Sequence, residues 1–93
     1  MNSKTYKLVF TRDVEKQLKK LDSYQAKLIV RWLYLNIDGI DDPRKHGKGL
    51  KSNLSGLWRY RVGAYRIIVE IEDTRLVVTT INIGHRKNVY DKN

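Results

Sequence analysis

The sequence has 93 residues, with 19 Lys and Arg against 10 Asp and Glu, a formal net charge of +9 and no cysteine. This length fits one domain over residues 1–93, and a chain without cysteine has neither a disulfide framework nor a cysteine-ligated metal site. The basic excess favours a polyanionic partner, and we expect a cytoplasmic protein with no membrane partner, because the sequence shows no signal peptide and no apolar run of about 20 residues.

The first part of the chain predicts a strand followed by two helices. Residues 7–10 are rich in β-forming side chains and precede Thr11, a residue type that caps helices. Apolar residues then recur at helical spacing, which predicts one helix over 12–21 and a second over 24–37. Asp22-Ser23 ends the first helix and caps the second. This short connection makes the two helices antiparallel neighbours.

The second part predicts three strands after a loop over 38–55 that Gly and Pro interrupt. β-forming residues cluster over 57–62, 65–71 and 76–83, separated by turn residues. We therefore expect one α+β domain in the order β-α-α-β-β-β, with an N-terminal strand and a helical hairpin packed on an antiparallel sheet.

The first two of these strands form a hairpin with an unusual pair of charges. If Gly63-Ala64 is a two-residue loop, Val62 pairs with Tyr65, and Arg61 faces Arg66. Like charges directly opposite each other destabilise a sheet. A site that binds phosphate gains from the same pair, because each guanidinium is a fixed, always charged fork that fits phosphate oxygens. The hairpin is therefore the candidate floor of a phosphate site.

The last strand predicts a third member of this site. If Ile71 pairs with Leu76 across the next turn, Arg66 pairs with Ile81. His85 lies four residues beyond Ile81 and shares its face, because side chains alternate along a strand. We therefore expect the two hairpin arginines and His85 to converge on one side of the sheet, an expectation that a one-residue slip in register would reverse.

The basic residues are unevenly distributed along the chain. Between Arg44 and Arg66 there are seven basic residues and no acidic one, and aromatic residues alternate with them. Basic residues interleaved with Trp58, Tyr60 and Tyr65 favour a nucleic-acid surface over a surface that serves only solubility.

These residue types suffice to cleave RNA without a metal ion. The ribose 2′-OH attacks the adjacent phosphate, a base takes its proton, cations neutralise the phosphate, and an acid protonates the leaving 5′-oxygen. Arg61 and Arg66 suit the charge-neutralising role, and His85 supplies the side-chain type whose unperturbed pKa lies near neutrality. Tyr90 suits stacking on a base or orienting the phosphate. The sequence contains no zinc, calcium or P-loop spacing, so it predicts no metal and no cofactor. A passive RNA-binding surface would have a similar composition.

Two stretches resemble the RelE/ParE superfamily of toxins from type II toxin–antitoxin systems. Residues 53–67, NLSGLWRYRVGAYRI, are similar to the YoeB branch, and residues 84–90, GHRKNVY, are similar to RelE-type members. The resemblance implies a RelE-like fold and a ribosome-dependent mRNA endoribonuclease that acts in the ribosomal A site. It also implies a cognate antitoxin protein as partner, with DNA contacted only through the antitoxin complex.

The resemblance also implies which residues are catalytic or bind RNA. RelE-type members use basic side chains of two strands, an arginine after the last strand and a C-terminal tyrosine. With His85 added because of its expected face on the sheet, the candidate catalytic residues are Arg61, Arg66, His85, Arg86 and Tyr90, and the candidate RNA-binding residues are Lys48, Lys51 and Arg59.

The general base stays open among three residues. Arg59 and Arg61 stand where RelE has lysines, and arginine holds its proton too tightly to act as a base. Lys48 takes the place of a glutamate that the YoeB branch uses. Lys48, Lys51 and His85 are therefore the candidates.

Two other functions are compatible with the same resemblance. One is a ParE-like inhibitor of DNA gyrase that cleaves nothing, since one fold hosts both activities. The other is a weakly active toxin that acts mainly by binding its antitoxin and repressing their shared operon. The basic residues together with Tyr90 favour the nuclease.

Overall fold

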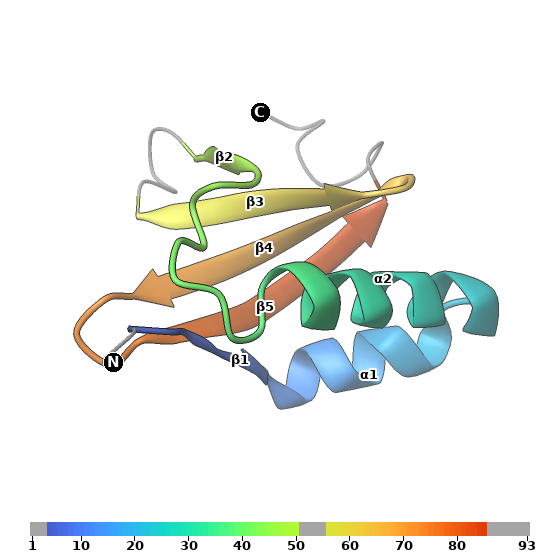
Figure 1. The fold of residues 1–93 in the computed structure, drawn as a ribbon. Coiled ribbons are helices and arrows are strands. Elements are labelled where there is room, and N and C mark those ends of the chain that lie inside the picture. Colours follow the sequence, from blue (N-terminus) through green and yellow to red (C-terminus); the bar gives the residue numbers. More distant parts are fainter. Residues whose placement is uncertain (1–3, 51–55, 86–93) are drawn as a thin grey trace.

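The computed structural model describes residues 4–50 and 56–85, which form a five-stranded sheet with two helices (Figure 1). The elements in chain order are β1 (Lys7–Phe10), α1 (Arg12–Lys20), α2 (Ser23–Asn36), β2 (Lys48–Gly49), β3 (Leu57–Val62), β4 (Tyr65–Glu72) and β5 (Val77–His85). The predicted α+β class and element order are confirmed. The two-residue strand β2 is an addition, because it lies inside the stretch that the sequence predicts as loop.

The sheet has the strand order β1-β5-β4-β3-β2 and is mixed. Strand β1 runs parallel to β5, whereas the other three neighbouring pairs are antiparallel, so the expectation of an antiparallel sheet holds for those pairs only. The parallel pair joins the two ends of the described fold, and the helices between β1 and the later strands allow the crossover that such a pair requires.

Both helices begin at the caps that the sequence predicts. The Thr11 hydroxyl accepts a hydrogen bond from the Val14 amide at 3.1 Å, and α1 begins at Arg12, directly after Thr11. One Asp22 carboxylate oxygen accepts from the Tyr24 and Gln25 amides at 3.1 and 3.3 Å, and α2 follows. These bonds satisfy amides that have no partner within the helix. No helix in the described ranges has the length and apolarity needed to cross a membrane.

The hydrophobic core lies between the helices and one face of the sheet. Helix residues such as Val14 and Leu33 and strand residues such as Tyr60 and Ile67 are fully buried there. Both helices lie on the same side of the sheet (Figure 1). Because side chains alternate along each strand, every second strand residue points to the opposite face, which no helix of the described residues covers.

A small polar cluster ties three distant segments together. The Tyr6 hydroxyl donates a 2.6 Å hydrogen bond to Asp73 in the β4–β5 turn. Arg44, in the loop after α2, donates two bonds of 2.9 and 3.1 Å to the same carboxylate. The hydrogen bonds from Arg44 and Tyr6 hold the pKa of Asp73 below its usual range. The cluster therefore anchors the loop that leads into β2.

The lowered pKa of Asp73 makes this cluster sensitive to acid. Its folded-state pKa lies below the unfolded value, so its contribution to stability is present above the ordinary Asp pKa and is lost as the pH falls through the folded value. We expect urea unfolding midpoints to drop more for the wild type than for Asp73→Asn between about pH 7 and about pH 3. Equal drops for the two proteins would contradict this assignment.

Candidate functional site

The β3–β4 hairpin has the predicted register. Val62 pairs with Tyr65, and Arg61 pairs directly with Arg66. Gly63 has a φ of 61° at the bend, in the left-handed region that glycine adopts without strain. Directly paired residues share a face of the sheet, so the two guanidinium groups start from neighbouring positions on the same face. The predicted like-charge pair is therefore confirmed.

The predicted register of the last strand is wrong. Arg66 pairs with Gly84, three positions beyond the predicted Ile81, and His85 pairs with Tyr65. An odd shift reverses the faces, so His85 takes the same face as Tyr65, opposite to the arginines. Its ring packs edge-on against the Tyr65 ring, with centroids 5.5 Å apart. His85 therefore does not converge with the hairpin arginines on one face.

Two local features produce this shift. The β4–β5 turn is longer than predicted, because Ile71 pairs with Val78 instead of Leu76, and Leu76 turns the chain with a φ of 56°. A β-bulge then shifts the register between Ile68 and Val69. The longer turn shifts the pairing of β5 with β4 by two residues, and the bulge shifts it by one more, which gives the total of three. A bulge is not visible in the residue pattern, since it inserts one residue into an otherwise regular strand.

Four basic residues of β2, β3 and β4 lie together on the face turned away from the helices, and we call this part of the sheet the basic face: Lys48, Arg59, Arg61 and Arg66. Lys48 of β2 pairs with Arg59 of β3, which places both on this face beside Arg61. Lys48, Arg59, Arg61 and Gly47 line a pocket of about 330 Å³. Lys48 and Arg61 are exposed, and the pocket therefore presents cationic groups to a ligand in solvent.

The aromatic residues that alternate with the arginines point the other way. The Trp58 indole donates a 2.6 Å hydrogen bond to the His46 carbonyl, and the Tyr60 hydroxyl donates a 2.6 Å bond to the Pro43 carbonyl. Burial raises the pKa of the Tyr60 hydroxyl, which keeps it a donor. The interpretation of these aromatics as part of a nucleic-acid surface is therefore wrong: they bind the loop before β2 to the sheet, because alternation along β3 separates them from the arginines.

Gly47 lets this loop lie against β3. It has a φ of 80°, and a Cβ atom added there would overlap the Arg59 carbonyl oxygen and lie 2.9 Å from Cδ1 of Tyr60. No larger residue fits this close approach. Sequence reasoning missed Gly47, Trp58 and Tyr60 as residues that position Lys48. The available signal was the Gly-Lys-Gly run inside a loop that precedes a strand rich in large aromatics.

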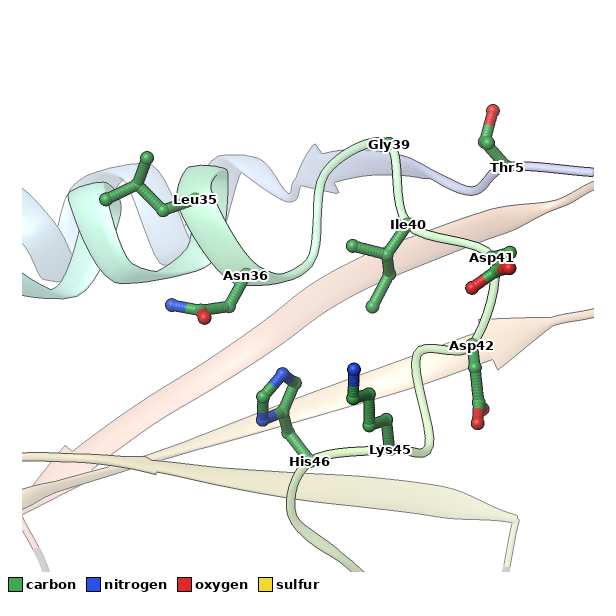
Figure 2. A pocket seen from close by; sticks show the side chains of 9 residues that line it. All are labelled: Thr5, Leu35, Asn36, Gly39, Ile40, Asp41, Asp42, Lys45 and His46. Carbon is green, nitrogen blue, oxygen red and sulfur yellow. The ribbon is translucent and has the colours of Figure 1, made fainter. Parts of the chain in front are cut away.

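A second, larger pocket of about 410 Å³ lies beside the loop that follows α2 (Figure 2). The side chains of Lys45 and His46 point from the loop toward Ile40 and Asn36 (Figure 2). Its lining also includes Asp41 and Asp42, whose charges oppose an anionic ligand. The full lining is Thr5, Leu35, Asn36, Gly39, Ile40, Asp41, Asp42, Lys45 and His46. The pocket on the basic face is therefore the better candidate for binding phosphate.

Comparison with known proteins identifies the family. The family described as the ParE toxin of the type II toxin–antitoxin system parDE matches residues 8–90. The chain belongs to this toxin family. Two curated relatives from Mycobacterium tuberculosis bear RelE-type names. Toxin RelG is 27% identical over 85 residues, covering 91% of this chain and 95% of RelG, and toxin RelE is 28% identical over 88 residues, covering 95% and 89%.

Solved structures of RelE toxins share the fold of this toxin. The RelBE2 toxin–antitoxin complex of M. tuberculosis contains a chain with a TM-score of 0.79 and 26% identity, covering 90% of this toxin and 94% of that chain. The intact E. coli RelBE complex gives a TM-score of 0.69 at 22% identity, covering 87% and 96%. The RelE-like fold is confirmed, and the family match makes the protein a toxin of a type II toxin–antitoxin system.

Three candidate residues of the toxin, Lys51, Arg86 and Tyr90, lie outside the described residues. The structure brings Lys48, Arg59, Arg61 and Arg66 onto one face, and it separates His85 from them. Within residues 4–50 and 56–85, no group of three His, Asp or Glu side chains is arranged to hold a metal ion. The charges available at the described site are therefore those of arginine and lysine.

Proposed function

We propose that this toxin is a metal-independent endoribonuclease that cleaves mRNA in the ribosomal A site. The ribose 2′-OH attacks the adjacent phosphate, and the phosphate gains negative charge in the transition state. The observation that carries the proposal is the direct pairing of Arg61 with Arg66 beside the basic pocket. Fixed cations held where charge develops lower the barrier, because they need no reorganisation during the reaction.

The remaining candidate residues complete the proposal. Arg59 and Lys48 suit contacts with the RNA backbone near the scissile phosphate. Lys51 is a further candidate for binding the RNA backbone. Arg86 and Tyr90 supply a further cation and a phenol, as the family resemblance implies. A catalytic role for His85 stays a prediction, although its place on the opposite face of the sheet does not support it.

The proposed partners are a cognate antitoxin, the ribosome and mRNA. Relatives of this toxin have been solved in complex with their RelB antitoxins. The formal charge of +9 favours both an acidic protein partner and an RNA partner, because each releases counterions on binding. The reaction requires the basic face to be accessible, so an antitoxin that covers this face would neutralise the toxin.

Primer extension on an mRNA in a translating extract tests the proposed activity. With the toxin present, we expect new 3′ ends within codons that occupy the A site, and none when translation is blocked before elongation. The family description names parDE, which keeps gyrase inhibition as the second candidate. Intact mRNA together with loss of plasmid supercoiling would contradict the nuclease and support the gyrase inhibitor.

A further inference from the structure

We propose that Lys48 is the general acid of the cleavage reaction, giving its ammonium proton to the 5′-oxygen that leaves. This inference rests on the proposed function and assigns a chemical step to one side chain of the basic pocket. It goes beyond the role of Lys48 as a contact for the RNA backbone.

Lys48 lies beside the arginines of the basic pocket. Strand β2 pairs with β3 so that Lys48 lies directly opposite Arg59, and both line the pocket with Arg61. Lys48 is exposed, and the residues on either side of it in the chain are glycines. No neighbouring side chain on β2 therefore competes for the space around its ammonium group. A phosphate bound against Arg59 and Arg61 in this pocket would lie beside Lys48, because Lys48 is paired directly with Arg59 and lines the same pocket.

The residues that line the basic pocket differ in how readily they give up a proton. Of the four described residues that line this pocket, Gly47 has no side chain, and two are arginines, the most weakly acidic of the cationic side-chain types. A lysine ammonium is a stronger acid than an arginine guanidinium by about two to three pKa units, so it gives a proton more readily to the alkoxide that leaves. Among the lining residues in the described part of the chain, Lys48 is therefore the one best suited to act as an acid.

The step balances without a further reactant. The bond from the 2′-oxygen to phosphorus forms, and the bond from phosphorus to the 5′-oxygen breaks. The electron pair of the broken bond stays on the 5′-oxygen, which takes a proton from Nζ of Lys48. The 2′-OH proton passes to solvent, and the Lys48 amine regains a proton from solvent after the reaction. The products are a 2′,3′-cyclic phosphate and a 5′-hydroxyl.

A substrate whose leaving group needs no proton tests this role. Ribosomes are programmed with a synthetic mRNA that carries sulfur in place of the bridging 5′-oxygen at the scissile linkage. Lys48→Arg keeps the positive charge and removes the transferable proton. We expect this variant to cleave the natural mRNA about 10²–10⁴-fold more slowly than the wild type. We expect it to cleave the sulfur-containing mRNA at the wild-type rate, because a thiolate leaves without protonation.

Two further variants separate this role from others. Lys45→Arg, three residues earlier in the same loop, should leave both rates unchanged, because Lys45 lines the other pocket. Arg61→Gln should slow both substrates, because it removes charge from the phosphate site in either case. Circular dichroism checks that each variant is folded.

Three outcomes would overturn the inference. An equal loss on both substrates for Lys48→Arg would mean that Lys48 only binds or positions the RNA. An unchanged rate on the natural mRNA would mean that another group is the acid. A wild-type toxin that cleaves neither substrate would overturn the proposed nuclease function, and the assignment of Lys48 with it.

Discussion

Gly47→Ala is expected to abolish most cleavage and to lower the free energy of unfolding by about 2–4 kcal/mol. The added Cβ atom would overlap the Arg59 carbonyl oxygen, and the backbone there has a φ of 80°. Backbone atoms of a sheet cannot yield as a flexible side chain can, so the loop must lift away from β3. Lys48 is the next residue, and it would leave its position opposite Arg59. Urea unfolding and primer extension measure the two effects.

Gly39→Ala provides a matched control for this experiment. Gly39 has a φ of 81°, almost the same as that of Gly47, but among the described residues no heavy atom beyond Gly39 and its two chain neighbours lies within 4 Å of the place that a Cβ atom would occupy there. Its substitution therefore costs only the backbone strain of about 1–2 kcal/mol and should leave cleavage unchanged. Equal effects of the two substitutions on cleavage would refute the close approach of the loop as the feature that positions Lys48.

Arg61→Gln is expected to reduce the rate of mRNA cleavage by about 10²–10³-fold, the typical cost of removing one group that stabilises a transition-state charge. The Arg61 side chain is exposed and pairs with another cation across the ladder, so its loss should leave the fold intact. Removing the like-charge pair should even raise the free energy of unfolding by a few tenths of a kcal/mol. Single-turnover cleavage on programmed ribosomes and urea unfolding measure these opposite changes.

Arg75→Gln serves as the control for net charge. Arg75 lies in the β4–β5 turn with its side chain 69% exposed, and it forms a surface ion pair with Glu72 at 2.8 Å. Such a pair contributes little to stability, and Arg75 does not line the basic pocket. The substitution changes the charge of the protein as Arg61→Gln does. If both variants lost the same activity, the effect would arise from overall charge, and the pairing of Arg61 with Arg66 would have no special role.

These experiments also distinguish whether the aromatic residues of the basic stretch contact RNA or hold the loop before β2. The run from Arg44 to Arg66 is uniform in composition, but β3 divides it into two functions by alternation. The β3 arginines Arg59 and Arg61 lie on the basic face, while Trp58 and Tyr60 bind the preceding loop through the carbonyls of His46 and Pro43. Substitution of an aromatic residue here would therefore change cleavage by moving Lys48, without removing a contact to RNA.

The two helices, the four longer strands and the β3–β4 hairpin of this toxin could be predicted from its residues alone. Helical periodicity and the capping residues Thr11 and Asp22 predicted both helices, and the turn at Gly63 predicted that Arg61 faces Arg66. These features depend on residues only a few positions apart, whose preferences are readable from the chain. The like-charge pair, the main signal for the site, could be predicted for the same reason.

The way distant segments meet became visible only in the folded molecule. The parallel pairing of β1 with β5, the bulge that sends His85 to the opposite face, and the docking of Gly47 on β3 each depend on packing between residues far apart in the chain. A strand pattern has a period of two and carries no record of an inserted residue or of a longer turn. The face on which a side chain lies therefore follows from the assembled sheet, and that face decides which residues can meet at one phosphate.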